Sequence, residues 1–390
     1  MFITEGRINW KYLLIVAIWA VIVGGGIWVY FGDVVRNIIS PSQFSEIPEV
    51  IPTLTEEESK NHILFARGND LWSSDITGKD QKEILTNIEL SGPVKFDVNI
   101  SPDHQKILYF SGDDIYLSKS DGSNSRLVVK AVTQKVFDTR FNPPSEGIRY
   151  PKIVWASDSN AFLYIKSPPS NDPQKNIYQI YFIDLNTSKE QFIREMTTDY
   201  SSVGISFAGW DRTNNEIYTF RVGLVDGGVS EGIVINSLNG DIKNEYNITG
   251  LTYEVSPKYD KFILSILGPI GLPDKLTIRN IRTGEVLKTI EINIFPDKWS
   301  PDGEKILLVG GKILEIDSEK ITKIFEYEGT GCGAVAWSPD SNYITYTSSP
   351  GNGMDTSLNV IKIDGSYKKE IIKEYTGGNC DRFDLGWGHY

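Results

Sequence analysis

Short apolar runs alternate with polar turns along most of the chain, and one such pattern recurs. In its clearest copy, 299–309, a tryptophan is followed by Ser-Pro-Asp-Gly and then by an apolar run that begins seven residues after the tryptophan. The stretch 337–347 repeats this pattern almost intact. Proline fixes the backbone angle φ at one turn position, and the aspartate accepts hydrogen bonds from nearby backbone amides. The pattern therefore predicts two antiparallel strands joined by a tight turn in which the aspartate has a structural role.

Each copy has an apolar anchor residue at the end of its first strand, and successive anchors lie 38 to 55 residues apart. The six anchors are Ile100, Trp155, Trp210, Val255, Trp299 and Trp337. Further apolar runs follow each hairpin and end in Asn-Gly, Thr-Gly or Asp-Gly turns, which supply the positive φ of tight hairpins. Four short strands per repeat are typical of a β-propeller, in which small sheets stand radially as blades.

The two ends of this region carry incomplete copies of the repeat. Trp387 is a seventh anchor with no second strand after it, whereas the strand predicted at 62–67 has no anchor before it. We expect the last strand to complete the blade that begins near residue 62, which closes the ring. The predicted fold class is therefore all-β, a seven-bladed β-propeller, with six or eight blades as alternatives. The five tryptophan anchors should occupy equivalent places between neighbouring blades.

The Trp-Ser-Pro-Asp-Gly hairpin, followed by a third strand and an Asp-Gly turn, resembles the repeat of TolB-like propellers. The same repeat occurs in the propellers of prolyl-oligopeptidase-type proteases. The resemblance covers residues 62–390 and is strongest at 299–303 and 337–341. It implies a fold rather than an activity, because propellers carry many unrelated functions. We expect neither the α/β domain that precedes the propeller in TolB nor a hydrolase domain after it.

A run of twenty residues without a charged side chain occupies 12–31. A helix of this length spans about 30 Å, the thickness of the hydrocarbon core of a bilayer. We therefore expect a transmembrane helix at 12–31, after a cytoplasmic stub at 1–11 and before a linker at 32–60 that contains prolines and acidic residues. The propeller domain then takes 61–390. A cleavable signal peptide is the alternative reading of the apolar run.

The charged residues predict the orientation of the chain in the membrane and argue against one class of partner. Arg7 and Lys11 precede the apolar run, and only Arg36 follows it closely. Because cytoplasmic flanks are rich in lysine and arginine, we expect a single-pass protein of the cell membrane with an extracytoplasmic propeller. The formal net charge of −12 argues against nucleic acid as a partner.

No arrangement of residues predicts a catalytic group, a metal site or a cofactor. In the one Gly-x-Ser-x-Gly motif, Ser230 follows a glycine-rich stretch and precedes a predicted strand, whereas a nucleophile elbow needs a strand before the serine and a helix after it. His62, His104 and His389 have no ligand-like neighbours at metal spacing. Asp113 and the aspartate after it are interpreted as turn residues.

The predicted connections differ between the two faces of the ring. The turn face carries the turns between strands one and two and between strands three and four, all of them short. The loop face carries the other connections and every long insertion, namely 131–149, 167–176, 222–230, 267–274 and 348–357. Because binding residues concentrate on variable loops held by a rigid scaffold, we expect binding on the loop face. The candidate residues there, at the entries of innermost strands, are Asp97, Arg149, Asp297, Asp381 and Arg382.

Two functions are compatible with this organisation. The first is a scaffold that binds a protein or peptide partner in the cell envelope through the loop face. The alternative is an enzyme that processes envelope glycan or peptide at the mouth of the central channel. Converging carboxylates near the axis of the ring would favour the enzyme.

The two cysteines, Cys332 and Cys380, precede the anchors Trp337 and Trp387 by a few residues. Both should therefore enter innermost strands of neighbouring blades on the loop face. A Cα separation of roughly 4.4–6.8 Å, which a disulfide requires, is compatible with that placement. Because oxidising compartments preserve disulfides, we predict a Cys332–Cys380 bond; two unrelated buried thiols are the alternative.

Overall fold

The computed structural model divides the chain into two compact units, Met1–Pro52 and Thr53–Tyr390. The residues it describes are 3–4, 7–8, 55–56, 58–67, 70–86, 88, 99–130, 134–138, 145–149, 152–166, 168, 172, 175–199, 203–225, 228–236, 238–249, 251–268, 273–326, 334–348, 356–375 and 385–389. In the first unit, β1 (Ile3–Thr4) pairs antiparallel with β2 (Arg7–Ile8). None of the helices in these ranges has the length and apolar character needed to cross a membrane. The predicted transmembrane helix at 12–31 lies outside the described residues.

The described strands of the second unit form seven four-stranded antiparallel sheets, which we number as blades. Blade 1 combines β32 (Leu385–His389) with β3 (Asn61–Arg67), β4 (Asp70–Ser74) and β5 (Lys82–Leu85). Blade 2 contains β6 (Asn99–Ile100), β7 (Lys106–Ser111), β8 (Asp114–Lys119) and β9 (Arg126–Val129). Blade 3 contains β12 (Lys152–Trp155), β13 (Ala161–Lys166), β14 (Lys175–Asp184) and β15 (Lys189–Asp199). Blade 4 contains β16 (Val203–Asp211), β17 (Glu216–Val225), β18 (Gly228–Asn236) and β19 (Ile242–Thr249).

The remaining blades follow the same order, from the innermost strand outward. Blade 5 contains β20 (Leu251–Val255), β21 (Lys261–Leu267), β22 (Pro273–Asn280) and β23 (Val286–Glu291). Blade 6 contains β24 (Pro296–Trp299), β25 (Lys305–Leu308), β26 (Lys312–Glu315) and β27 (Ile321–Lys323). Blade 7 contains β28 (Val335–Trp337), β29 (Tyr343–Ser348), β30 (Thr356–Lys362) and β31 (Lys368–Tyr375). A separate hairpin pairs β10 (Gln134–Asp138) with β11 (Ser145–Arg149), and the 3₁₀ turn η1 (Glu58–Lys60) precedes β3.

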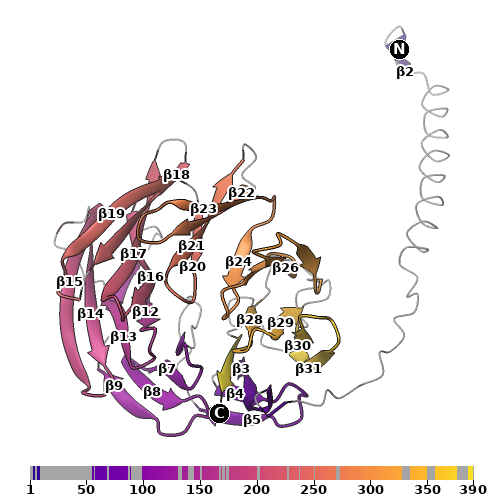
Figure 1. Cartoon of the computed structure of the whole chain (residues 1–390), viewed down its shortest axis with the longest axis horizontal. Helices are drawn as coiled ribbons and strands as arrows, with labels where there is room; N and C mark the ends of the chain where they lie inside the picture. The colour runs from indigo at the N-terminus through magenta and orange to yellow at the C-terminus, as the bar shows by residue number, and fades with distance from the viewer. Residues whose placement is uncertain are drawn as a thin grey trace. The chain divides into compact units, whose positions relative to one another are not determined.

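Both ends of the propeller meet in blade 1, as predicted. The strand β32 pairs antiparallel with β3, so that Trp387 lies opposite Ile63. Figure 1 shows the C-terminus beside β4 and β5, which come from the start of the second unit. The innermost strands β6, β12, β16, β20 and β24 contact one another in this order, and β32 contacts both β28 and β6. Lys298 of β24 reaches the carbonyl of Val335 in β28. The blades therefore form a closed ring, in which six use consecutive strands and one joins the two ends of the chain.

The tryptophan anchors lie between blades, which confirms the prediction of equivalent places. Trp155 packs with Leu108 and Ile115 of the preceding blade, and Trp299 packs with Ile263 and Leu276 of its own preceding blade. In both cases the indole N–H donates to a carbonyl of that blade, from Trp155 Nε1 to Asn99 O at 3.0 Å and from Trp299 Nε1 to Glu254 O at 3.4 Å. The hydrophobic core is thus a series of separate cores, one for each pair of neighbouring blades.

The short turns share one face of each blade. In blade 5 the amide of Ile281, after strand three, donates to the carbonyl of Asp260, before strand two, at 3.0 Å. The same bond recurs in blade 2, from Ser120 to Gln105 at 2.9 Å. These bonds place the turns between strands one and two and between strands three and four together, and so define the turn face.

The loop predicted at 222–230 is wrong, because this segment belongs to paired strands. Val222 lies opposite Glu231 and Val225 lies opposite Gly228, so that β17 and β18 form one long hairpin on the loop side. Part of the stretch predicted at 131–149 is likewise the hairpin β10–β11. Strand pairing rather than irregular chain therefore builds much of the described loop face.

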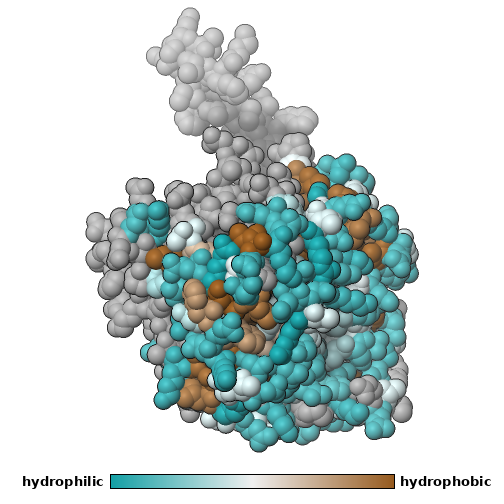
Figure 2. Space-filling view, turned by 60° about the vertical axis from the view of Figure 1, so that its left-hand side comes forward, coloured by the Kyte–Doolittle hydropathy of each residue, from teal (hydrophilic) through white to brown (hydrophobic). Residues whose placement is uncertain are grey.

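Exposed apolar side chains mark the outermost strands of several blades. Those with the largest exposure include Phe192 in β15, Ile242 in β19, Leu287 in β23 and Ile321 in β27. Figure 2 shows brown patches separated by hydrophilic residues on the face that it presents. Scattered exposed apolar residues are ordinary on a protein surface and need no partner to explain them.

Candidate functional site

Most of the predicted site residues fall outside the described part of the chain. These are Asp97, Asp381, Arg382 and both members of the predicted disulfide, Cys332 and Cys380. Arg149 ends β11, where its backbone lies opposite Gln134. Asp297 lies in β24, the innermost strand of blade 6. The described part of the predicted site is therefore the surroundings of Asp297.

Asp297 occupies a β-bulge. In the pairing of β24 with β25, Pro296 lies opposite Leu308 and Lys298 opposite Leu307, which leaves Asp297 without an opposite residue. The innermost strands β16 and β20 carry the same irregularity two residues before their anchors. Because a bulge changes the direction of neighbouring side chains and is frequent next to functional sites, this position deserves a functional reading.

Two charged residues next to these bulges connect three blades near the axis of the ring. The backbone N–H of Trp299 in blade 6 donates to Glu254 Oε2 of blade 5 at 2.6 Å. The Nζ of Lys298 in blade 6 donates to the carbonyl of Val335 in blade 7 at 3.2 Å. With Asp297, these residues form a group of one base and two acids on innermost strands, which we name the axial cluster: Glu254, Asp297 and Lys298.

The environment of Glu254 changes its acidity. Burial raises the pKa of its carboxyl from 4.5 to about 7, and nearby Asp297 adds to the rise, while Lys298 and the Trp299 amide oppose it. The residue nevertheless keeps partial exposure to solvent. A carboxyl with this pKa exchanges its proton near neutral pH, which is what a general acid or base needs and what a structural carboxylate rarely shows.

Sequence reasoning identified Asp297 but missed Glu254 and Lys298. Each of these two residues stands directly before an anchor, Val255 or Trp299. At the corresponding position of the other copies the residues are uncharged, namely Asn99, Val154, Gly209, Ala336 and Gly386. The position before each anchor was therefore an available signal.

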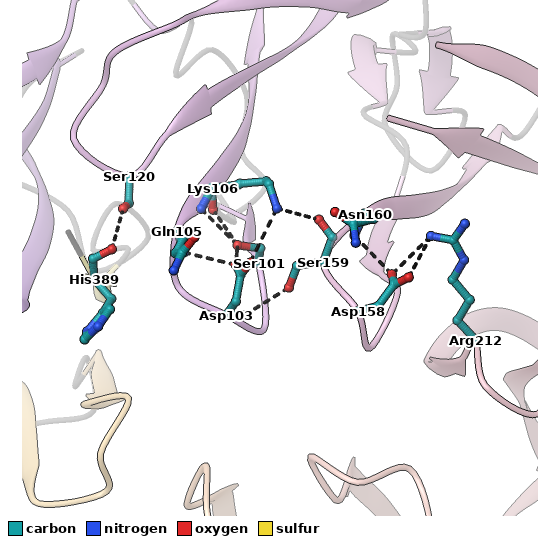
Figure 3. A network of polar contacts seen from close by, with 10 residues as sticks. All are labelled: Ser101, Asp103, Gln105, Lys106, Ser120, Asp158, Ser159, Asn160, Arg212 and His389. Carbon is teal, nitrogen blue, oxygen red and sulfur yellow. Dashed lines mark hydrogen bonds and ion pairs between the residues drawn. The ribbon is translucent and has the colours of Figure 1, made fainter. Parts of the chain in front are cut away.

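On the turn face, polar contacts connect blade 2 to blades 1 and 3, and blade 3 to blade 4 (Figure 3). Within blade 2, Ser101 Oγ donates to Asp103 Oδ1 at 2.5 Å and accepts the Lys106 amide at 2.9 Å. The Asp103 amide then donates to Ser159 Oγ of blade 3 at 3.0 Å, and Lys106 Nζ donates to the Ser159 carbonyl at 3.0 Å. We call these blade-to-blade contacts the turn belt. The aspartates have the structural role predicted for them.

Where the Ser-Pro-Asp sequence is lost, ion pairs replace the serine contact. Arg212 of blade 4 pairs with Asp158 of blade 3 at 2.9 Å. Arg282 of blade 5 pairs with Asp211 and Glu216 of blade 4 at 2.8 and 2.7 Å. Hydrogen bonds from Tyr218 and Arg282 outweigh the effect of burial and lower the pKa of Glu216. The belt thus uses charged pairs at the two joints that flank blade 4.

The three histidines meet where the ring closes. The His389 amide donates to the His104 carbonyl at 2.8 Å, His104 Nδ1 lies 2.9 Å from the Trp387 carbonyl, and His389 Nδ1 lies 3.0 Å from Asn61 Oδ1. His62 lies on β3, opposite Gly388. No group of three His, Cys, Asp or Glu side chains suited to a metal ion occurs in the part of the chain that the structure describes.

Ser230 has the backbone context of a strand residue. It lies within β18, opposite Gly223 on one side and Thr249 on the other. A nucleophile elbow is a sharp turn between a strand and a helix. The motif therefore lacks the backbone context of a nucleophile elbow.

Comparison with known proteins gives similarity to one family model and to several solved structures. A family model described as "Eukaryotic translation initiation factor eIF2A" matches residues 242–375, about a third of the chain. TolB from Acinetobacter baumannii is 16% identical, with a TM-score of 0.42 over 84% of this chain and 83% of that one. A eukaryotic initiation factor is 11% identical, with a TM-score of 0.45 over 84% and 98%. A putative dipeptidyl aminopeptidase IV from Bacteroides ovatus is 11% identical, with a TM-score of 0.43 over 82% and 51%. A search of curated proteins gave no match.

Proposed function

We propose that this chain is a single-pass membrane protein whose extracytoplasmic propeller binds a protein or peptide partner through its loop face. One observation carries the proposal, the lengthening of blades 3 and 4 on that side. The strands β14, β15, β17 and β18 have 10, 11, 10 and 9 residues. The outer three strands of blade 6 have only four, four and three. The added residues extend the loop face of two adjacent blades and form an uneven wall.

The rest of the ring supports this use of the loop face. The turn belt fixes the opposite face, and a rigid scaffold with one variable face is the usual arrangement of a binding module. The chain also enters the propeller on the turn face. There Glu58 accepts a hydrogen bond from Tyr343 Oη at 3.1 Å and lies 3.5 Å from Lys362 Nζ.

The experiment is to shorten the long hairpin. Replacing 222–231 by Asn-Gly connects Arg221 to Gly232, which already lie opposite each other, and keeps the four-stranded blade. We expect the full-length variant to retain its melting temperature and to lose a partner that the parent crosslinks in membranes. A control variant, Asn239→Ala in the turn between β18 and β19, should keep the partner. Retention of the same partner by the shortened chain would contradict the proposal.

An enzyme of envelope glycan or peptide remains the second candidate, and the axial cluster favours it. A carboxyl with a pKa near 7 beside a lysine is suited to proton transfer at neutral pH. Glu254→Gln separates the two functions, because an enzyme that uses this carboxyl would lose turnover while a loop-face scaffold would keep its partner.

A further inference from the structure

The joint between blades 5 and 6 has a glycine in place of the serine that connects blades 6 and 7 in the turn belt. Between blades 6 and 7 the Asp302 amide donates to Ser341 Oγ at 3.0 Å, as Asp103 does to Ser159. At the joint between blades 5 and 6 the corresponding residues are Lys258 and Gly303. A Cβ atom built on Gly303 would meet nothing within 4 Å. The belt is therefore open at this joint, because one partner has no side chain.

A cleft of about 320 Å³ occupies the opening. Its outer end is crossed by Lys288, whose Nζ lies 3.2 Å from Glu319 Oε1 and 3.3 Å from the Asp317 carbonyl. Trp299 lines the cleft, and its indole N–H is already used by Glu254 O. Trp299 is only 5% exposed, so the apolar surface available in the cleft comes mainly from the exposed side chain of Leu287.

The charges of the cleft are separated by blade. All three lining lysines, at 258, 261 and 288, come from blade 5, and all three lining acids, at 302, 304 and 317, come from blade 6. Lys258 makes no ion pair with any described residue, and Lys261 has only a loose contact of 3.8 Å with Asp260. On the opposite wall, Glu304 is exposed and 4.0 Å from Lys305, and Asp317 is also exposed. Each wall thus keeps charged groups available to a ligand.

The geometry points to a ligand-binding site for a dipolar molecule the size of an amino acid or dipeptide, with a carboxylate facing blade 5 and an ammonium group facing blade 6. A volume of this size lies at the lower end of small-molecule sites. A ligand with a single charge would pair either with the lysines of blade 5 or with the acids of blade 6, and would leave the other set without a partner. An apolar side chain of the ligand would lie on Leu287. This site is separate from the loop face and does not depend on the function proposed for it.

The probe is the dipeptide Ala-Leu with both ends free, titrated into the full-length protein and followed by ligand-observed NMR. Because exposed ion pairs contribute little each, we expect a dissociation constant on the order of 1 mM. N-acetyl-Ala-Leu lacks the ammonium group and Ala-Leu amide lacks the carboxylate. Each should bind at least about threefold more weakly than the free dipeptide. Equal binding of the free and blocked forms would overturn the proposal, as would a lack of saturation up to on the order of 10 mM.

Variants assign the two ends of the ligand. Lys258→Ala should weaken the free and acetylated dipeptides by about threefold and leave the amide unchanged, whereas Asp317→Asn should weaken only the forms with a free ammonium group. Lys320→Ala removes an equal charge outside the cleft and should change nothing. Gly303→Ser should narrow the opening and weaken binding without unfolding the chain, because Ser159 and Ser341 have the same positive φ at this position, 58° and 60°. Binding that is unchanged by Gly303→Ser, or that responds equally to Lys320→Ala and Lys258→Ala, would overturn the proposal.

Discussion

Trp337 and Trp387 are equivalent anchors that differ in one hydrogen bond, and this difference predicts the cost of removing the indole nitrogen. The Nε1 of Trp387 donates to the Ala336 carbonyl at 3.2 Å. The Nε1 of Trp337 is buried and has no acceptor among the residues that the structure describes. Both side chains are buried, with 1% exposure for Trp387 and 5% for Trp337, so that Trp→Phe removes a similar buried volume at both sites.

The magnitude follows from the bond alone. At Trp387, replacement by Phe loses a buried hydrogen bond, worth about 0.5–1.5 kcal/mol. At Trp337 the same change removes a buried N–H group that makes no hydrogen bond. Removing this group is favourable, and the gain offsets part of the stability lost with the side-chain volume. We therefore expect Trp387→Phe to be more destabilising than Trp337→Phe by about 1–2 kcal/mol.

Urea unfolding of the full chain, followed by far-ultraviolet circular dichroism, measures both variants against the parent. The difference should also appear as a lower melting temperature of Trp387→Phe, by about 2–4 °C per kcal/mol or somewhat less in a domain this large. If Trp337→Phe were as destabilising as Trp387→Phe, the bond to Ala336 would contribute nothing and the reasoning would be refuted.

Further outcomes are expected from the belt, the closure and the axial cluster. Ser341→Ala should cost about 1 kcal/mol in urea unfolding by leaving the Asp302 amide without its acceptor, and Ser341→Gly should cost less because it relieves the positive φ. Burial lowers the pKa of His104, so the stability that the neutral imidazole contributes is present above pH 6.5 and is lost as pH falls. The variant His104→Asn, whose side chain tolerates the φ of 57°, should show a smaller loss of stability at low pH. The pKa of Glu254 is raised, so stability falls as pH rises from about 4.5 to 7, and Glu254→Gln should remove this slope. The predicted Cys332–Cys380 bond requires that thiol titration of the denatured, unreduced protein find no free thiol; two free thiols would exclude it.

The fold was predictable because the information that specifies it is local and repeated. Each anchor stands a fixed distance before the next apolar run, and each turn carries the residues that its backbone requires. The positive φ of His104, Ser159 and Ser341 recurs at the fourth residue after the anchor, where glycine stands in one other copy. Even the closure by Trp387 follows from counting an incomplete copy at each end.

The long hairpin of blade 4 was missed because glycine is common both in irregular loops and in the turns of β-hairpins. The stretch between Arg221 and Gly232 contains three glycines and was interpreted as a loop. Its central residues are Asp226 and Gly227, a pair that also marks a two-residue hairpin turn. The flanking valines and leucine alternate in a way that favours strands, and the pairing of Val225 with Gly228 agrees with that pattern.

The chemistry near the axis was less predictable, because it depends on which blades are neighbours. The sequence shows one acid and one base before adjacent anchors, but the raised pKa of Glu254 comes from burial between β20 and β24. The same holds for the cleft on the turn face. Lysines of blade 5 and acids of blade 6 are unremarkable surface residues until the ring places the two blades side by side.

Both features belong to the joint between blades 5 and 6, and Trp299 connects them. Its backbone amide holds Glu254 Oε2, its indole N–H holds Glu254 O, and its ring lines the cleft. At this joint the belt lacks its serine, so the two bonds to Glu254 take over part of the connection between the blades. A ligand that moves the Trp299 ring would lengthen the indole bond to the Glu254 backbone carbonyl, whereas the bond to Glu254 Oε2 comes from the backbone of Trp299. The axial cluster and the cleft therefore belong to a single interface between blades 5 and 6, in which Trp299 contacts both.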